Sequence, residues 1–495
     1  MLVPVVLSGG NGSRLWPVSR EAHPKPFIRL NNDPYSLIQK TYQRAVNLPN
    51  VEKIITVTNF EYYYQSKKEL SDLGLAANSK EFNFILEPCS RNTAAAIVFS
   101  ALFIKEMIDP EAILLVLPAD HIILNQDKFN SSIAKAYQLA KKNLLTTFGI
   151  IPHKPETAYG YIQYFESKEL NSAFKVVNFF EKPKCEEAKS FIEQGNYLWN
   201  SGIFCFSVKA FLQAIKQYAP ELYLKASNCW KLSIKQNNNF QDKIKLEKES
   251  FSVLENISID YALMEKAQNI AVLPADFGWS DVGSWDALNT LLEPSEHGNR
   301  IVGNAFLKET HNTTIYSQNS PGRLIAVLGV KNLTIVDTID ALLICEQDQV
   351  QKVKQVVEEL KLNGQESYRY HQTVYRPWGH YTILDQGLNY KLKRLIVHAG
   401  ASLSLQMHQY RSEYWVVVAG TATVENDQKK IILKEQESTF IALGHKHCLS
   451  NFDDQDLILI ELQIGSYLGE DDIIRFRDNY DREHHTISKE ENLCH

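Results

Sequence analysis

The chain has 495 residues, of which 44% are apolar and 22% are charged, and its net charge is −6. These values are typical of a globular protein with two or three domains. Without a basic excess the chain is excluded as a general nucleic-acid binder, so any phosphate recognition must be local.

The cysteines, the N-terminus and the length of the apolar runs indicate where in the cell the protein is located. The seven cysteines are scattered without a CxxC pair, which disfavours disulfide and zinc-finger interpretations and indicates a reducing compartment. The N-terminus lacks a basic segment with a cleavage site, so we expect no signal peptide. No apolar run reaches ~18 residues, so we expect no transmembrane helix. These features predict a cytoplasmic protein with no membrane partner.

Short β-branched runs alternate with helical patterns over residues 1–150. The expected strands are Val3–Leu7, Lys53–Thr58, Phe82–Leu86, Ile113–Leu117 and Leu145–Ile151, and the expected helices cover Leu37–Ala45 and Thr93–Met107. This alternation predicts βαβ units and a mostly parallel sheet covered on both faces, with ligands beyond the carboxyl ends of its strands. Residues 150–290 alternate less cleanly, as expected of a substrate-facing half.

The first expected strand leads into a glycine-rich loop, LSGGNGSRLWP, at residues 7–17. Its glycines leave backbone N–H groups uncovered, so the chain can surround phosphate oxygens. Arg14 and Lys25 add positive charge there, which predicts a nucleoside triphosphate site. A Rossmann turn fits poorly because Leu15 and Trp16-Pro17 interrupt the pattern. The Walker A pattern is absent, and an ordinary glycine-rich turn remains the alternative.

Two carboxylates follow apolar or aromatic segments. Asp120 lies in LPADH, directly after an expected strand, and Asp281 lies in the turn WSDVGSW. Facing a triphosphate, two such groups would hold Mg²⁺, which prefers one or two carboxylates together with phosphate oxygens. The alternative is that each aspartate caps a helix or turn. The adjacent charges of Glu181 and Lys182 have a similar alternative, an ordinary surface ion pair.

The second half of the chain changes to β patterns. Residues 299–345 carry short β runs that predict a small β module, followed by an amphipathic helix at Val350–Leu360 and a polar linker at Asn363–Gln372. From Tyr375 to Gln463 the pattern is all-β and predicts an antiparallel sandwich or barrel. The polar residues Glu483–His495 form an expected tail.

A second candidate site lies in this all-β region. Gln406, His408 and Tyr410 alternate, so we expect them on one face of a strand. Glu413 follows, and His447 lies on a later segment. A histidine, a glutamate and a distant histidine that converge inside a small barrel would suit a divalent metal. Satisfied polar residues of a β domain are the alternative.

The motifs, in chain order, resemble one family closely. GGxGxRLWP with Lys25-Pro26, EPCSRNT at 87–93, LPADH, YGYI, FxEKP, NSGIF and WSDVGSW are similar to those of the sugar-1-phosphate nucleotidyltransferases, specifically the mannose-1-phosphate guanylyltransferases. The resemblance covers residues 1–290 and continues through Gly329–Cys345. The family usually has Thr at the position of Ser13, which keeps the hydroxyl. Residues 375–475 resemble the cupin domain fused to these transferases, the type II mannose-6-phosphate isomerases.

The resemblance implies an organisation and a function. We expect a Rossmann-like (GT-A-like) α/β nucleotidyltransferase domain over 1–290, a β module with linker helix over 291–365, an all-β cupin barrel over 366–482 and a tail over 483–495. The implied reaction transfers GMP from GTP to mannose 1-phosphate, giving GDP-mannose and pyrophosphate for polysaccharide biosynthesis. Where the cupin domain is active, it would interconvert mannose 6-phosphate and fructose 6-phosphate. We also expect a homo-oligomer.

The resemblance also implies roles for residues. The GTP phosphates would be held by Gly9, Gly10, Gly12, Ser13 and Arg14, and the nucleoside by Glu87, Asn92 and Thr93. Lys25 would stabilise the departing pyrophosphate, and Asp120 and Asp281 would hold Mg²⁺. The sugar phosphate would be bound by Lys182 and the sugar hydroxyls by Gly160, Glu181 and Asn200.

In the cupin domain the implied set is Gln406, His408, Glu413 and His447 around Zn²⁺ or Co²⁺, with Arg411 in contact with substrate. The family usually has His at the positions of Gln409, Tyr410 and Tyr414, and Pro at that of Ala442. Tyr410 therefore stands where a cupin typically places a histidine ligand.

Two other functions remain open at this point. One is a nucleotidyltransferase for another base or sugar, since guanine and mannose are favoured only by the resemblance. The other is a regulatory subunit that binds a nucleotide sugar without turnover. The presence of Arg14, Lys25, Asp120 and Asp281 argues against the second.

Overall fold

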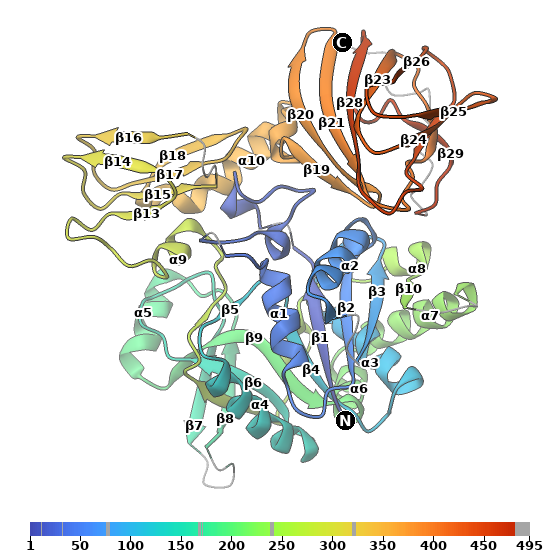
Figure 1. The fold of residues 1–495 in the computed structure, drawn as a ribbon. Coiled ribbons are helices and arrows are strands. Elements are labelled where there is room, and N and C mark those ends of the chain that lie inside the picture. The colour runs from blue at the N-terminus through green and yellow to red at the C-terminus, as the bar shows by residue number, and fades with distance from the viewer. Residues whose placement is uncertain are drawn as a thin grey trace. The chain divides into compact units, whose positions relative to one another are not determined.

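The computed structural model describes residues 1–10, 12–31, 33–75, 80–166, 170, 172–237, 242–318 and 323–480. The chain divides into two compact units, Met1–Tyr368 and Arg369–His495, and each is described by itself (Figure 1). The expected tail over 483–495 lies outside the described residues.

The first unit is built on a ten-stranded sheet in the order β10-β3-β2-β1-β4-β9-β6-β11-β8-β7. Its strands are β1 (Leu2–Ser8), β2 (Lys53–Asn59), β3 (Glu81–Glu87), β4 (Ile113–Pro118), β6 (Leu145–Ile150), β7 (Tyr161–Glu166), β8 (Phe174–Phe180), β9 (Tyr197–Ser207), β10 (Lys243–Lys245) and β11 (Ile270–Ala275). The β10-β3-β2-β1-β4 half is parallel. β9 enters antiparallel between β4 and β6.

Both faces of this sheet are covered, because neighbouring residues of its strands face opposite sides. Val3 and Val5 pack with the apolar faces of α3, α6, α7 and α8, whereas Leu2 and Val6 pack with those of α1, α2 and α4. The helices are α1 (Leu37–Val46), α2 (Tyr63–Asp72), α3 (Asn92–Met107), α4 (Gln126–Lys141), α5 (Cys185–Gln194), α6 (Val208–Tyr218), α7 (Pro220–Gln236), α8 (Lys248–Ser252) and α9 (Trp285–Asn289).

Residues 150–290 continue the same sheet through β7, β8, β9 and β11. The mostly parallel pairing expected from residues 1–150 is confirmed in β1, β2, β3 and β4, whereas the later strands add antiparallel pairs that make the whole sheet mixed. Sequence periodicity does not show strand direction, and β9 belongs beside β4 only through long-range pairing.

A coil of short strands completes the first unit. β13 (Arg300–Val302), β15 (Thr314–Ser317) and β17 (Leu333–Asp337) pair in parallel, as do β14 (Ala305–Lys308) and β16 (Ile325–Leu328), and β18 (Leu342–Glu346) closes antiparallel on β17. α10 (Val353–Leu362) follows. Val336 and Val353 share a core with Leu15 and Trp16, so this module packs against the segment that follows the glycine loop.

The second unit consists of two antiparallel sheets around an apolar core. One sheet has the order β19-β20-β21-β28-β23-β26 and the other β25-β24-β27-β22-β29. The strands are β19 (Thr373–Arg376), β20 (Gly379–Gly387), β21 (Tyr390–Val397), β22 (Leu405–Met407), β23 (Arg411–Ala419), β24 (Ala422–Asn426), β25 (Lys429–Leu433), β26 (Ser438–Ile441), β27 (His447–Ser450), β28 (Leu457–Gly465) and β29 (Ile474–Arg477). This is the expected cupin barrel.

Candidate functional site

The glycine loop leaves open backbone at the carboxyl end of β1. A Cβ added at Gly9 or Gly10 would meet no atom within 4 Å, whereas one at Gly12 would lie 2.5 Å from Lys25 Cβ. Gly12 also has φ +59°, and it begins the short helix η1 (Ser13–Leu15). Arg14 in η1 is partly exposed, and no ion pair joins it to another described residue. The open amides and this guanidinium suit a phosphate ligand.

Lys25 lies beside the glycine loop and contacts both of the aspartates that were predicted to bind Mg²⁺. It is buried in the short helix η2 (Lys25–Phe27). Its Nζ lies 3.0 Å from Asp120 Oδ2, and it donates a hydrogen bond to the backbone carbonyl of Asp281. Burial is the largest single influence and would raise the pKa of the Asp120 carboxyl, but the charge of Lys25 and the hydrogen bonds to the carboxylate together hold that pKa below its ordinary value.

A small antiparallel ladder places the two aspartates together. β5 (Ile122–Ile123) follows Asp120, and β12 (Trp279–Ser280) precedes Asp281. The register joins Ser280 with Ile122, so the two acidic segments run side by side. His121 accepts a hydrogen bond from Trp279 Nε1 (3.1 Å), and burial lowers its pKa to about 4, so this imidazole is neutral. We assign it a structural role.

Tyr159 is a site residue that the sequence reasoning missed. Its hydroxyl donates to Asp281 Oδ1 at 2.6 Å, and Gly283 N donates to the same oxygen at 3.0 Å. The Tyr159 ring packs edge-on against Trp199 and Trp279. Because Tyr159 directly precedes Gly160, it connects the expected sugar-binding residues to Asp281. The YGYI motif was noticed in the sequence, but nothing in it pointed to this contact.

The residues expected around the sugar lie together. A Cβ at Gly160 would sit 2.6 Å from Glu181 Oε2 and 3.5 Å from Asn200 Cβ, so a side chain there would displace the Glu181 carboxylate. Asn200 Nδ2 donates to Asp260 Oδ1 at 2.9 Å. Lys182, with φ +52°, is exposed and pairs with Glu181 at 2.8 Å.

Asp260 is the second residue that the sequence reasoning missed. It begins a short π-helix, η6 (Asp260–Met264). Burial, and after it the negative charge of Glu181, raises the pKa of its carboxyl to about 7. A carboxyl that titrates near neutrality beside a sugar-binding candidate is a functional signal, and no spacing in the sequence could have revealed it.

The residues expected around the nucleoside lie where β3 meets α3. Glu87, the last residue of β3, is buried, its Oε1 has no hydrogen-bond partner among the described residues, and burial raises its pKa to about 8. A protonated carboxyl there could donate a hydrogen bond to a ligand. Asn92 is exposed with φ +62°, whereas the Thr93 hydroxyl accepts from Ile259 N at 2.9 Å.

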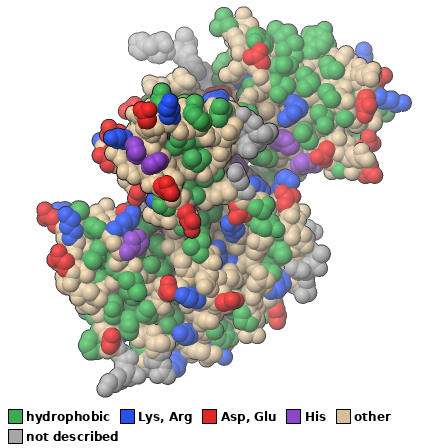
Figure 2. All heavy atoms as spheres, turned by 60° about the vertical axis from the view of Figure 1, so that its left-hand side comes forward, with side chains coloured by type: hydrophobic (Ala, Val, Ile, Leu, Met, Phe, Trp, Pro, Cys, Tyr) green, Lys and Arg blue, Asp and Glu red, His purple; other side chains and the backbone are tan. Residues whose placement is uncertain are grey.

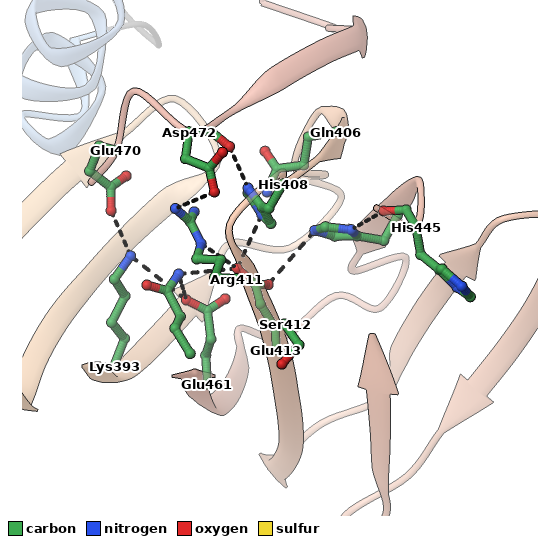
Figure 3. A network of polar contacts seen from close by, with 12 residues as sticks. Lys393, Gln406, His408, Arg411, Ser412, Glu413, His445, Glu461, Glu470 and Asp472 are labelled. Carbon is green, nitrogen blue, oxygen red and sulfur yellow. Dashed lines mark hydrogen bonds and ion pairs between the residues drawn. The ribbon is translucent and has the colours of Figure 1, made fainter. Parts of the chain in front are cut away.

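The second unit holds a buried cluster of His408, Glu413 and His447, whose ligand atoms lie within 4.8 Å of one another. His408 Nδ1 donates to the Asp472 carbonyl (2.8 Å) and His447 Nδ1 to the His445 carbonyl (3.0 Å). Each imidazole thus turns its Nε2 toward Glu413, at 3.1 and 3.7 Å. Figure 3 shows His408 and Glu413 converging. Neutral imidazole nitrogens oriented in this way suit a divalent metal.

Polar side chains of the barrel interior surround this cluster. Arg411 Nε donates to Glu413 Oε1 at 3.2 Å. Glu413 and Glu461 share two donors, Trp415 Nε1 and Gln463 Nε2. Burial, and then the Glu413 charge, raises the pKa of Glu461 to about 7. The interior is thus rich in carboxylates, which a divalent cation would balance.

Gln406 lies beside the cluster. Its position in β22 pairs with His447 in β27, so the two side chains share one face of the sheet. Its Oε1 accepts from Ser404 Oγ at 3.0 Å. The structure therefore brings all four expected ligand candidates to one place in the barrel, together with Arg411.

The expectation that Tyr410 shares a face with Gln406 and His408 is wrong. β22 ends at Met407, and the chain then turns, because the Asp472 carboxylate accepts from the backbone N–H groups of Gln409 and Tyr410. The Tyr410 side chain is consequently 50% exposed. Tyr414 lies on the outer face of β23. At all three positions where the family usually has His, the side chain present here is exposed and lies outside the cluster.

The described residues contain no further group of three metal-ligating side chains with this proximity. The six described cysteines are free thiols. Within the described part of the chain, no helix combines the length and the apolar character that crossing a membrane requires.

Comparison with known proteins gives matches along the whole chain. Three family models match: Nucleotidyl transferase over residues 3–296, MannoseP isomerase/GMP-like beta-helix domain over 303–360 and Mannose-6-phosphate isomerase C-terminal over 363–478. A mannose-1-phosphate guanylyltransferase of Escherichia coli K12 is 41% identical, covering 97% of this chain and 99% of that protein. The Xanthan biosynthesis protein XanB of Xanthomonas campestris (strain ATCC 33913) is 40% identical with the same coverage.

A solved structure supports the fold of the first unit. It comes from Thermus thermophilus, is described as a mannose-1-phosphate geranyltransferase, and superposes with a TM-score of 0.61 at 28% identity. The superposition covers 73% of this chain and all of that one.

Proposed function

The chain belongs to the nucleotidyl transferase family of mannose-1-phosphate guanylyltransferases, and from this membership we propose that it transfers GMP from GTP to mannose 1-phosphate. The products are GDP-mannose and pyrophosphate. The observation that carries the proposal is the position of Lys25, which contacts both Asp120 and Asp281 directly beneath the glycine loop.

The chemistry needs no covalent intermediate. A phosphate oxygen of mannose 1-phosphate attacks the α-phosphorus of GTP, the new P–O bond forms, and the bond to pyrophosphate breaks. Because the nucleophile is already an anion, catalysis is positioning together with charge neutralisation. The amides of Gly9, Gly10 and Gly12 with Ser13 hold the phosphates, and Arg14 and Lys25 neutralise the charge that develops on pyrophosphate.

The acidic pair fits Mg²⁺. Asp120 and Asp281 present two carboxylates on adjacent segments, the number that this hard cation takes when phosphates supply the remaining oxygens. Mg²⁺ would neutralise phosphate charge and draw the two substrates together. Tyr159 and Gly283 hold the Asp281 carboxylate in orientation.

The remaining candidates divide between the two substrates. Glu87, with its unpartnered oxygen, and Asn92 and Thr93 lie on the nucleoside side. Lys182 binds the sugar phosphate, and the edge formed by Gly160, Glu181 and Asn200 binds sugar hydroxyls.

We propose a second activity for the cupin barrel, the interconversion of mannose 6-phosphate and fructose 6-phosphate. The Nε2 atoms of His408 and His447, which face the Glu413 carboxylate, fit Zn²⁺ or Co²⁺ together with that carboxylate. Such a metal would polarise the sugar carbonyl and hydroxyl during proton transfer between C1 and C2. Arg411 would contact substrate, and Gln406 would be the fourth ligand.

Further proposals concern the cellular location, the oligomeric state and the partners of the enzyme. We place it in the cytoplasm, consistent with its free thiols, as a homo-oligomer without nucleic-acid or membrane partners. A transferase that uses another base or sugar is the second candidate, and supplying ATP, UTP or glucose 1-phosphate tests it directly.

The deciding experiment is pyrophosphate release from GTP and mannose 1-phosphate by the wild type, Asp281→Asn and Asp276→Asn. Asp276 is a matched control, because it lies five positions away and pairs with Lys128 at the surface. We expect Asp281→Asn to abolish release and Asp276→Asn to retain it. Near-normal turnover in Asp281→Asn would overturn the metal assignment. A wild type that binds GTP without turnover would favour the regulatory alternative.

The second activity is tested separately with mannose 6-phosphate. We expect fructose 6-phosphate to form when Zn²⁺ or Co²⁺ is added. No product with Zn²⁺, Co²⁺ or Mn²⁺ would remove the isomerase proposal and leave the transferase untouched.

A further inference from the structure

The side chain of Asn200 is held at both ends of its amide. Its Oδ1 accepts from the backbone N–H of Gly202 at 3.2 Å and from Thr147 Oγ1 at 3.2 Å. Because a backbone N–H can only donate, the atom that it meets must be the amide oxygen, and this fixes which way the amide points. The Nδ2 of Asn200 then donates to Asp260 Oδ1 at 2.9 Å.

This network leaves Asn200 one hydrogen-bonding role toward a ligand. Two donors occupy both lone pairs of its oxygen, and Asp260 takes one of the two N–H groups of Nδ2. Within the described part of the chain no residue accepts from the other N–H. Asn200 therefore offers a donor, and the Asp260 carboxyl is the acceptor that keeps this donor in place.

Glu181 offers the opposite role at the same position. The Glu181 Oε2 atom and the Asn200 Cβ atom both approach the position that a Cβ would take at Gly160, at 2.6 and 3.5 Å, so the two side chains converge there. A carboxylate can only accept hydrogen bonds, whereas Asn200 can only donate here. A sugar hydroxyl accepts one hydrogen bond and donates another, so it matches this pair.

The backbone around Asp260 is anchored on the other half of the proposed site. Ile259 N donates to Thr93 Oγ1 at 2.9 Å, and Ala94 N donates to the Ile257 carbonyl at 3.3 Å. The first turn of α3 thus holds the segment that begins η6, and the Asp260 side chain extends from this segment to Asn200. The position of Asn200 is therefore set by a fixed support.

Long-range electrostatic attraction cannot select one sugar over another. On the face of the first unit shown in Figure 2, Lys and Arg side chains lie among Asp and Glu side chains, so this face presents no broad field of one sign. Sugars that carry the same phosphate also have the same charge. Selection between them depends on short-range hydrogen bonds to their hydroxyls.

We propose that Asp260 is a positioning residue for the sugar, which fixes the Asn200 amide so that Asn200 and Glu181 together bind one hydroxyl of the sugar phosphate. Asp260 acts through Asn200. A sugar that lacks this hydroxyl, or directs it elsewhere, would leave the donor and the acceptor unpaired, and such a loss discriminates strongly. The inference rests on the transferase proposed above and adds a residue to its sugar site.

Steady-state kinetics of pyrophosphate release by full-length Asp260→Leu and Asp260→Asn tests this role. Because Leu cannot accept the hydrogen bond, we expect Asp260→Leu to raise KM for mannose 1-phosphate at least about tenfold and to leave KM for GTP unchanged. The amide oxygen of Asp260→Asn can still accept, so this variant should restore the wild-type KM. Asp242→Leu is the control, since its carboxylate pairs with Lys67 beside the edge strand β10.

Thr147→Val tests the same network from its other end. Thr147 is fully buried and Val has nearly its shape, so this variant keeps the packing and loses one donor to Asn200 Oδ1. We expect its KM for mannose 1-phosphate to rise about threefold or more, again with an unchanged KM for GTP. This variant decides the question if Asp260→Leu does not fold.

The contradicting outcomes are distinct. A wild type that releases no pyrophosphate would overturn the transferase and this role together. With an active wild type, an unchanged KM for mannose 1-phosphate in Asp260→Leu or Thr147→Val, or an equal rise of both KM values, would overturn the role of Asp260 alone. An Asp260→Asn protein as impaired as Asp260→Leu would also contradict it, because the acceptor is then not what the sugar site needs.

Discussion

Tyr159 fixes the orientation of a carboxylate that the proposed transferase needs. Its hydroxyl donates to Asp281 Oδ1, while its ring is held by Trp199 and Trp279. Tyr159→Phe keeps the ring and removes the hydrogen bond. Because a hydrogen bond to a charged group contributes about 1.5–3 kcal/mol, we expect kcat for pyrophosphate release to fall about 10- to 100-fold.

Tyr164→Phe is the control for this variant, since among the described residues the Tyr164 hydroxyl donates only to the Gly195 carbonyl, at 3.4 Å. Both variants should keep the wild-type circular dichroism spectrum, so that any loss of activity is measured on folded protein. Equal activities of the two variants would show that the hydroxyl at position 159 has no role.

The carboxyl of Asp260 makes stability depend on pH. Its pKa is about 7 in the folded chain and about 3.9 when unfolded. Between these values the folded state holds a proton that the unfolded state has lost, so stability falls as the pH rises from about 4 to 7. Asp260→Asn cannot titrate.

We therefore expect the free energy of unfolding of Asp260→Asn to rise by about 1–3 kcal/mol relative to that of the wild type when the pH is raised from 5 to 8. The measurement is the free energy of unfolding in urea at both pH values. A difference between the two proteins that stays constant with pH would contradict the assignment.

At the scale of elements, the glycine loop contains glycines that are needed for two different reasons, folding and ligand binding. Gly12 is required by the fold, because it has φ +59° and its Cβ would clash with Lys25. Gly9 has open space around it, so only a ligand requires the missing side chain. We expect Gly12→Ala to lower both the unfolding temperature and GTP affinity.

Gly9→Ala is expected to keep the unfolding temperature and to weaken GTP binding at least about tenfold, because its methyl group would displace a phosphate oxygen from the amides. Titration calorimetry with GTP and Mg²⁺ measures this affinity. Unchanged affinity in Gly9→Ala would place the triphosphate elsewhere.

Elements with strong local signals were predictable. β1, β2, β3 and β4 are apolar runs buried on both faces, and α3 is buried without interruption over Ala94–Ile104. The position of β9 was not predictable, because it depends on pairing with β4 across about 90 residues. Tyr159 and Asp260 were missed for the same reason, since their partners Asp281 and Asn200 are distant in the sequence.

The error at Tyr410 has a local cause. Alternation over Gln406–Tyr410 is a strand pattern, but the strand ends at Met407 because Asp472 draws the following N–H groups into a turn. A side-chain contact made 62 residues away thus overrides the local period. The cluster of His408, Glu413 and His447 was nevertheless predicted, because its three residues come together whether the chain after Met407 forms a strand or a turn.

At the scale of the whole molecule, the two proposed sites lie in separate units. Glu413→Gln should lose bound metal and isomerase activity while pyrophosphate release stays at the wild-type rate. Tyr410→Phe should keep the metal, because Tyr410 is exposed. Metal content by mass spectrometry and both activities, measured on the same preparations, check this prediction. Loss of metal from Tyr410→Phe would show that Tyr410 is a metal ligand after all, as its position in the family pattern suggests.

Asp472 has a consequence for the order in which the two sites form during synthesis. Its carbonyl orients His408, and its carboxylate closes the turn that follows. The barrel site therefore cannot be completed until residue 472 has left the ribosome. Lys25 and the loop take the partners Asp120, Asp281 and Ser367 from the first unit, so these contacts can form while the barrel is still being translated. A ribosome stalled shortly after the first unit would carry a nascent chain in which the proposed triphosphate site has its residues in place, while the proposed isomerase site does not yet exist.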